Sequence, residues 1–201
     1  SDAPRNRSAP GRTISSMPAK PVATATHCSR ATRSPSSQGD SATITSGAVK
    51  APMPATLAPQ LASLASAAPT SGAWSWEIKL DGYRLMARID DGNVRLITRG
   101  GHDWSSKMPA LVKALQSLKL KSAWLDGEIV VMGKNGTPDF NALQNAFDRQ
   151  RTAQIVYFLF DAPFLEGRDL RELPLSERRS ALKTLLDARG TLTNRFLVVS
   201  N

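Results

Sequence analysis

The chain has 201 residues, a formal net charge of +9 at neutral pH and one cysteine. A single cysteine excludes an internal disulfide framework and a multi-cysteine zinc site, and the sequence has no apolar run of about 20 residues that could span a membrane. The excess of basic over acidic residues favours a polyanionic partner, and nucleic acid is the usual one.

Residues 1–51 are predicted to form a disordered basic tail or linker rich in Ser, Thr, Ala and Pro. Large apolar side chains are scarce there, so the segment cannot bury enough surface to offset the entropy of ordering. Residues 1–50 carry seven basic and two acidic residues, just over half of the net charge. The tail is either an electrostatic arm or a solvated linker. The tail lacks the apolar segment of a secretory signal, and its Arg- and Ser-rich composition with few acidic residues also fits an organellar transit peptide. A cytoplasmic protein fits best.

Residues 52–201 are predicted to form a folded domain in which strands and helices alternate. Period-two patterns predict strands, apolar spacings of three and four predict helices, and Asp-Gly dipeptides mark turns. Leu57, Leu61 and Leu64 are expected to dock as one helical stripe, and Ser176 to cap a helix that Gly190 ends. Strands are expected at 74–80, 83–89, 93–99, 122–132, 154–162 and 195–200, and helices at 108–120, 141–149 and 176–189.

This order of elements predicts an α+β domain with a mainly antiparallel sheet. Residues 154–162 are so uniformly apolar that they are expected to form a central strand buried on both faces. The last expected strand runs up to Asn201, so the domain is expected to be incomplete at its C-terminus.

A lysine beside a turn is the first candidate for chemistry. Lys79, Asp81, Gly82 and Arg84 form the pattern K-x-D-G-x-R. A lysine is a strong nucleophile only when deprotonated, and its ordinary pKa is about 10.4, so burial or a nearby cation must lower it. Gly82 admits close approach of backbone or ligand, and Arg84 offers a planar donor fork to ribose or phosphate. An exposed hairpin fits the same pattern, so both interpretations stand.

Two other residues have similar double interpretations, and a third, Arg99, is unspecific by itself. Glu128 lies in an apolar strand, where it either points to solvent or binds a ligand hydroxyl or a metal ion. Phe160 ends the most apolar strand, as a core residue or as a ring that stacks on a nucleobase. Arg99 places a cation beside a glycine-containing loop.

The combination of motifs is more specific than any one of them. The segments EIKLDGYRL, TRGGHDW, LDGEIVV, DFNALQ and YFLFDAPFLEGRDLRELPLSERR follow one another along the chain. In this order and spacing the chain resembles the covalent nucleotidyltransferases, and more closely the ligase domain of bacterial ATP-dependent DNA ligases of the non-homologous end-joining type. The resemblance covers about residues 52–199. It implies an antiparallel-rich α+β nucleotidyltransferase fold (ATP-grasp-like DNA ligase adenylation domain), here preceded by a disordered tail.

The resemblance also implies a role for each motif residue. Lys79 would attack the α-phosphate of ATP and hold AMP, with Asp81 and Gly82 in support. Arg84 and Glu128 would contact the ribose, Phe160 would stack on adenine, and the backbone at Glu77 and Ile78 would contact the adenine edge. Arg99 would contact the nucleotide phosphate or the DNA end. The cofactors implied are ATP and Mg²⁺ or Mn²⁺, with Glu128 as a candidate metal ligand, and the partners are nicked or broken duplex DNA and end-joining repair proteins.

Several alternatives remain open at this point. An RNA capping guanylyltransferase or RNA ligase shares Lys-x-Asp-Gly, although DFNALQ and LPLSERR favour the DNA ligase. An NAD-dependent ligase is disfavoured because its cysteine zinc cluster is absent. A truncated, inactive ligase fragment would bind nucleotide or DNA only weakly, because the family's later glutamate and lysine motifs and its OB-fold domain are not found before Asn201. Lys79 could also decorate the surface of an unrelated α+β domain.

Overall fold

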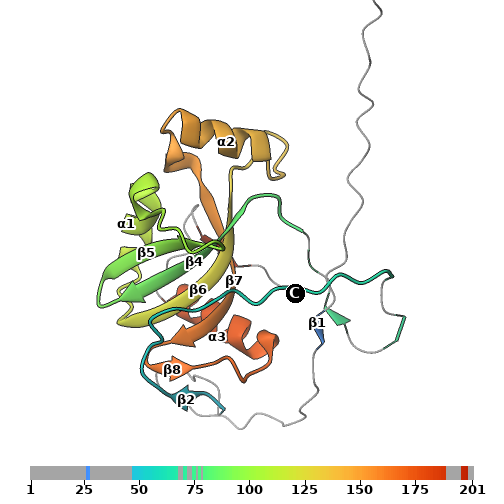
Figure 1. Cartoon of the computed structure of the whole chain (residues 1–201), viewed down its shortest axis with the longest axis vertical. Helices are drawn as coiled ribbons and strands as arrows, with labels where there is room; N and C mark the ends of the chain where they lie inside the picture. Colours follow the sequence, from blue (N-terminus) through green and yellow to red (C-terminus); the bar gives the residue numbers. More distant parts are fainter. Residues whose placement is uncertain are drawn as a thin grey trace, which may run out of the picture.

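A mainly antiparallel sheet forms the centre of the fold (Figure 1). The computed structural model describes residues 26–27, 47–67, 70–71, 74–75, 77, 79–188 and 196–198. The strand order is β2-β8-β7-β6-β4-β5, with β9 parallel to β7 and all other pairs antiparallel. The strands are β2 Val49–Lys50, β4 Tyr83–Asp90, β5 Asn93–Thr98, β6 Ser122–Val130, β7 Val156–Leu165, β8 Arg168–Asp169 and β9 Phe196–Val198. A separate two-stranded sheet pairs β1 (Thr26–His27) with β3 (Trp74–Ser75).

The helices connect consecutive strands or groups of strands, as the sequence predicts. They are α1 Pro109–Ser117, α2 Phe140–Asp148 and α3 Leu175–Ala188, with short 3-10 turns η1 Ser105–Lys107 and η2 Thr152–Gln154. Proline begins α1, and the Asp139 side chain caps α2 by accepting the Ala142 N–H at 2.9 Å. No helix in the described part of the chain is long and apolar enough to cross a membrane.

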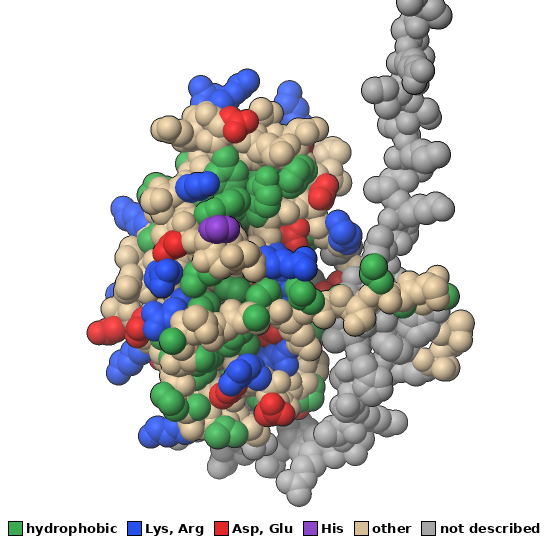
Figure 2. All heavy atoms as spheres, viewed as in Figure 1, with side chains coloured by type: hydrophobic (Ala, Val, Ile, Leu, Met, Phe, Trp, Pro, Cys, Tyr) green, Lys and Arg blue, Asp and Glu red, His purple; other side chains and the backbone are tan. Residues whose placement is uncertain are grey.

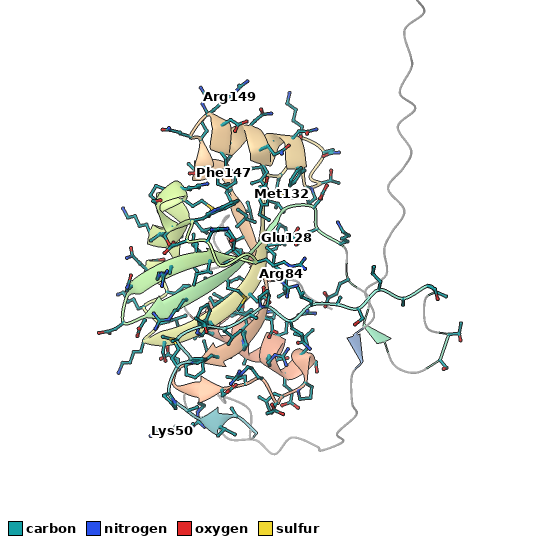
Figure 3. All side chains as sticks on the ribbon, in the orientation of Figure 1. Lys50, Arg84, Glu128, Met132, Phe147 and Arg149 are labelled. Atoms are coloured by element: carbon teal, nitrogen blue, oxygen red, sulfur yellow. The ribbon has the colours of Figure 1, made fainter. Side chains whose placement is uncertain are left out.

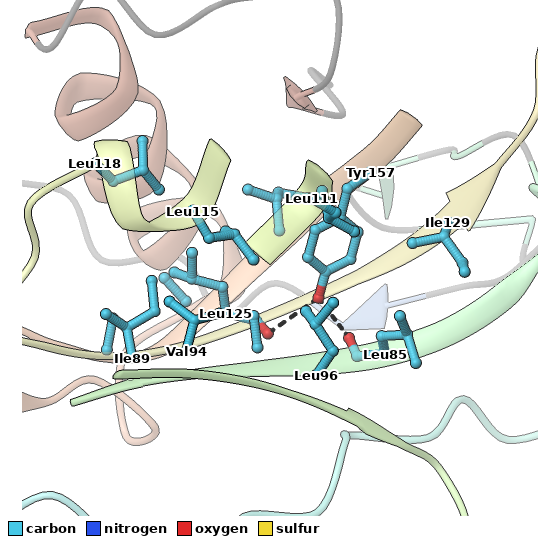
Figure 4. Close-up of a cluster of buried hydrophobic side chains, with 14 of the residues drawn as sticks. Leu85, Ile89, Val94, Leu96, Leu111, Leu115, Leu118, Leu125, Ile129 and Tyr157 are labelled. Carbon is cyan, nitrogen blue, oxygen red and sulfur yellow. Dashed lines mark hydrogen bonds between the residues drawn. The ribbon is translucent and has the colours of Figure 1, made fainter. Parts of the chain in front are cut away.

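The main core lies between the sheet and the helices. Leu111, Leu115 and Leu118 are nearly inaccessible, as their helical spacing predicts, and pack with alternate residues of β4 to β7 (Figure 4). The Tyr157 hydroxyl, fully buried among them, donates a hydrogen bond of 2.7 Å to the Leu85 carbonyl, and burial raises the pKa of this hydroxyl well above its usual value. The predicted central strand is confirmed, because β7 lies between β6 and β8.

A strap, residues 51–64, covers a second cluster on the opposite face of the sheet. Met86, Trp124 and Phe164 form this cluster, and Ala51, Met53 and Leu57 pack against it. The Trp124 indole N–H donates to the Pro54 carbonyl at 3.0 Å, which fixes the strap over β6. In Figure 1 the strap is the teal segment that crosses in front of the strands.

Two expectations about this region are wrong. The strap contains no helix, and only Leu57 docks, because Leu61 is 52% and Leu64 95% exposed. Of the strand expected at 74–80, residues 74–75 form β3, and the other described residues, Glu77, Lys79 and Leu80, lie outside any strand. The physical reason is that β5 and β6 occupy both edges of β4 from Leu85 onward, so a hairpin partner for these positions has no free edge to pair with.

The helix and tail expectations have mixed outcomes. α3 begins at Leu175, so Ser176 lies inside its first turn and is not its N-cap, while Gly190 is outside the described residues. The predicted hairpin at 90–93 is confirmed, with Asp91 and Gly92 at positive φ, the geometry of a type I′ turn. Most of the predicted tail is also outside the described residues. Val49 and Lys50 nevertheless pair with β8, and the domain boundary stays a prediction.

Candidate active site

A cavity of about 1070 Å³ gathers the residues singled out from the sequence. Its walls come from the end of the strap, the segment leading into β4, the loop after β5, and the facing positions of β6, β7 and α3. Of the nine predicted site residues, the eight that are described all line it, and Ile78 is outside the described residues. These eight are Glu77, Lys79, Asp81, Gly82, Arg84, Arg99, Glu128 and Phe160.

Strand register sets the first pair of these residues. Arg84 on β4 is the partner of Glu128 on β6, and Figure 3 shows the two side by side at one end of the sheet. Burial raises the pKa of the half-buried Glu128 carboxyl, and the Gly82 N–H and the Lys79 charge partly counteract this. Glu128 therefore lines the cavity within electrostatic reach of Lys79, which favours the interpretation as a ligand-binding residue over that of a solvated strand residue.

Gly82 brings the chain against the end of β6. A Cβ built on Gly82 would lie 2.1 Å from the Ile129 carbonyl oxygen and 2.9 Å from Val130 Cγ1. The close backbone approach predicted for this glycine is confirmed. It places the segment with Lys79 and Asp81 beside Glu128.

Arg84 is held before any ligand binds. Its Nε and Nη2 donate to the two carboxylate oxygens of Asp126 at 3.0 and 2.7 Å, and Nη2 also donates to the Gln60 carbonyl at 2.7 Å. Its Cζ lies 5.1 Å from the centroid of the Phe160 ring. Although burial acts to lower it, the pKa of Arg84 is raised by the hydrogen bond and charge of Asp126. The remaining nitrogen, Nη1, has no partner among the described residues and can donate to a ligand.

A second ion pair lies beside the first. Arg178 of α3 donates from Nε and Nη2 to Asp161 at 2.7 and 2.8 Å, with both side chains 6% exposed. Asp161 is the register partner of Asp126, so two buried carboxylates lie side by side on β7 and β6, each neutralised by its own arginine. Burial, with a smaller contribution from Asp161, raises the pKa of Asp126.

Arg179 extends this network to the adenine-binding segment implied by the motifs. It donates from Nη2 to the Glu77 carboxylate at 2.5 Å and from Nε to the Phe160 carbonyl at 3.1 Å. The side chain of Glu77 thus forms an ion pair with Arg179. Its backbone stays available for contact with the adenine edge, the role that the resemblance implies.

Sequence reasoning assigned no role to Gln60, Asp126, Asp161, Arg178 or Arg179. The signal was present in part, because an aspartate inside an apolar strand must find a cation when it is buried. Which arginine serves which aspartate depends on long-range packing, and local pattern does not determine it.

The loop that bears Arg99 is fixed by Asp103. Its carboxylate accepts the Ser105 hydroxyl and N–H through Oδ1 and the Arg95 Nε at 2.8 Å through Oδ2. The hydrogen bond from the Ser105 hydroxyl, followed by that from Arg95, lowers the pKa of Asp103. This holds Arg99, Gly100 and Trp104 along one wall of the cavity.

The carboxylates available for a metal ion are few. No cluster of three or more His, Cys, Asp and Glu residues occurs among the residues that the structure describes. Glu128 and Asp81 lie close enough for the charge of Asp81 to act on Glu128. One or two carboxylates completed by water and phosphate oxygens are a usual site for Mg²⁺, so these residues fit a metal that arrives with a nucleotide.

Comparison with known sequences gives consistent matches. The profile of the ATP dependent DNA ligase domain matches residues 52–198. The chain is 55% identical over 147 residues to the multifunctional non-homologous end joining protein LigD of Pseudomonas aeruginosa, covering 73% of this chain and 17% of that protein. It is 38% identical over 142 residues to the multifunctional non-homologous end joining DNA repair protein LigD of Mycobacterium tuberculosis, covering 70% and 18%.

Solved structures agree with the fold. The crystal structure of the ligase domain of M. tuberculosis LigD matches with a TM-score of 0.52 and 34% identity, over 61% of this chain and 38% of that chain. A mycobacterial DNA ligase D complexed with ATP and MES matches with the same score, identity and coverage. The predicted antiparallel α+β nucleotidyltransferase fold is confirmed. The chain spans less than a fifth of the length of these curated relatives.

Proposed function

Because this chain belongs to the family of ATP-dependent DNA ligase domains, we propose that it carries out the adenylation step of DNA ligation, with Lys79 as the nucleophile. The observation that supports this most is that the eight described residues expected from the motifs line one cavity. These residues come from four separate stretches of sequence, between Glu77 and Phe160. Chance surface decoration does not account for such convergence.

The proposed reaction begins at the Lys79 amine. Its nitrogen lone pair attacks the α-phosphorus of ATP, a P–N bond forms, and the bond to the bridging oxygen breaks so that pyrophosphate leaves with that electron pair. The amine gives up one proton to solvent, and AMP remains as a phosphoramidate. A DNA 5′-phosphate then displaces Lys79 from the adenylate, and the 3′-hydroxyl displaces AMP and seals the strand.

The other cavity residues hold the nucleotide in this proposal. Phe160 stacks on adenine, while the backbone at Glu77 and Ile78 contacts the adenine edge. Arg84 contributes its Nη1 donors to the ribose, since its other two nitrogens are engaged by Asp126 and Gln60. Glu128 accepts a ribose hydroxyl. Arg99, which also lines the cavity, contacts the phosphates or the DNA end.

A divalent cation, Mg²⁺ or Mn²⁺, completes the proposed site. Glu128 and Asp81 would hold it through carboxylate or water-mediated contacts. When bound, the cation neutralises phosphate charge during phosphoryl transfer. The Glu128 carboxylate lies within electrostatic reach of both Asp81 and Lys79, so a cation held there would act near the proposed nucleophile.

We also propose a wider setting, in which the printed names of the relatives support the end-joining process. The substrate is nicked or broken duplex DNA, the process is non-homologous end joining with other repair proteins, and the location is the bacterial cytoplasm at the nucleoid. Lys, Arg, Asp and Glu side chains are interspersed on the face seen in Figure 2. Residues 1–50, with seven basic residues, therefore offer the more concentrated positive charge for DNA.

A labelling experiment tests the proposed function. The chain is incubated with Mg²⁺ and ATP labelled at the α-phosphate, and label that survives denaturation is measured. We expect a stable adduct with the wild type and with Lys113→Ala, a control at an exposed lysine of α1, and none with Lys79→Ala. ATP labelled at the γ-phosphate should leave no label.

The outcomes separate the candidate functions. An adduct that persists in Lys79→Ala removes this lysine from the mechanism. No adduct from a folded wild-type chain refutes adenylation by this chain and favours the alternative, weak binding of nucleotide or DNA without chemistry.

A further inference from the structure

We propose that Gln60 is a positioning residue that holds Arg84 ready for the nucleotide and so links the strap to the cavity. The inference rests on the proposed function for its consequence in nucleotide binding, although the arrangement itself is independent of any ligand. Gln60 has no role in the motif-based assignment. It belongs to the strap, which precedes the lysine motif in the chain.

Gln60 contacts both of the buried ion pairs at once. Its backbone carbonyl accepts Arg84 Nη2 at 2.7 Å, and its side-chain Oε1 accepts Arg178 Nη2 at 3.1 Å. The two arginines are bound to Asp126 and Asp161, which face each other across β6 and β7. One residue thus joins two pairs that come from three strands and a helix.

The part of the strap that precedes Gln60 is held against the sheet. Leu57 packs on the cluster around Trp124, and the Trp124 indole binds the Pro54 carbonyl. Beyond Gln60, Leu61 and Leu64 are largely exposed at the rim of the cavity. The bond to Arg178 is therefore the last described side-chain hydrogen bond that holds the strap before the rim, and it determines where the Gln60 carbonyl lies.

The position of that carbonyl decides how firmly Arg84 is held. With Nη2 shared between Gln60 and Asp126, the guanidinium stays over the Phe160 ring, and Nη1 remains for the ligand. An arginine fixed in advance loses less rotamer entropy when it binds a nucleotide. Lys79 has no contact with this network among the described residues. Loss of the Gln60 side chain should therefore weaken nucleotide binding and leave the rate of the chemical step at saturation unchanged.

The first test needs no nucleotide. Exchange of the Arg84 Nε–H with water is measured by NMR on the full chain. In Gln60→Ala we expect it to be at least fivefold faster. The exchange rate should match the wild type in Gln60→Glu, which keeps an acceptor for Arg178. It should also match in Gln116→Ala, a control whose amide donates to the remote Gly92 carbonyl among the described residues. Unchanged exchange in Gln60→Ala overturns the proposal.

The second test measures binding by calorimetry with an ATP analogue whose α–β bridge cannot be cleaved. We expect five- to tenfold weaker binding in Gln60→Ala, the size of a typical net hydrogen bond, and binding within twofold of wild type in Gln60→Glu. In an Arg84→Lys background, Gln60→Ala should cause no further loss. Losses that simply add would show that Gln60 does not act through Arg84 and would overturn the proposal.

The two proposals fail in different ways. Absence of a Lys79 adduct refutes adenylation, while a faster Arg84 exchange in Gln60→Ala still supports the positioning role. Both contacts of Arg178 with Asp161 remain in the Gln60 variants, so their unfolding temperatures should stay close to that of the wild type, which separates positioning from a general loss of structure.

Discussion

Replacement of Gly82 by alanine should disable the cavity through a backbone clash. The new Cβ would lie 2.1 Å from the Ile129 carbonyl oxygen, about 1.3 Å short of the 3.4 Å at which ordinary contact begins. Both obstructing groups belong to the end of β6, which lies between β4 and β7 and cannot move freely. Overpacking of this kind costs about 1–3 kcal/mol of unfolding free energy. If the segment before β4 moves instead, Lys79 shifts by about 1 Å from Glu128, and about a hundredfold in rate is expected to be lost.

Urea unfolding and the rate of adduct formation test this together. Gly100→Ala is the matched control, because its Cβ would meet nothing closer than 3.4 Å and it lines the same cavity. We expect Gly82→Ala to lose stability, adduct rate or both, and Gly100→Ala to lose neither. A Gly82→Ala chain with wild-type stability and wild-type rate would refute the argument from close approach.

Three further predictions concern separate parts of the chain. Phe160→Leu should weaken ATP binding about fivefold, roughly 1 kcal/mol of stacking, while Phe158→Leu, equally half-buried but outside the cavity, should not. Asp103→Asn should lower the free energy of unfolding by about 0.5 kcal/mol at pH 7, a small amount because the ion pair of Asp103 with Arg95 is partly exposed. The pKa of Asp103 is lowered in the folded state, so the stabilisation that Asp103 contributes is present above the ordinary pKa of 3.8 and is lost as pH falls through the folded-state pKa. The urea midpoints of variant and wild type should therefore converge in acid, and a constant gap between them would contradict this. Deleting residues 1–46 should weaken DNA binding and flatten its salt dependence, and an unchanged slope would make this segment a linker.

Much of the fold was predictable because it depends on local pattern. The period-two alternation of 83–89 and 93–99 around an Asp-Gly turn has one stable solution, the β4–β5 hairpin. The leucines of 108–120 can bury one stripe only as a helix, and α1 does so. The predicted strand at 74–80 was wrong for a non-local reason, since alternation indicates a capacity to pair and the pairing edges of β4 were already occupied.

The candidate site was likewise predictable only in part. The sequence by itself determined which residue types could do chemistry, because Lys79, Arg84 and Glu128 stand in motifs of fixed spacing and their functional groups do not depend on the fold. Only the tertiary structure decided that they line one cavity, that Asp126 holds Arg84, and that Gln60 reaches across to Arg178. These facts depend on strand register and on the burial of charge between distant segments. Buried charges must be paired, but the partner is chosen by the packing of the whole sheet.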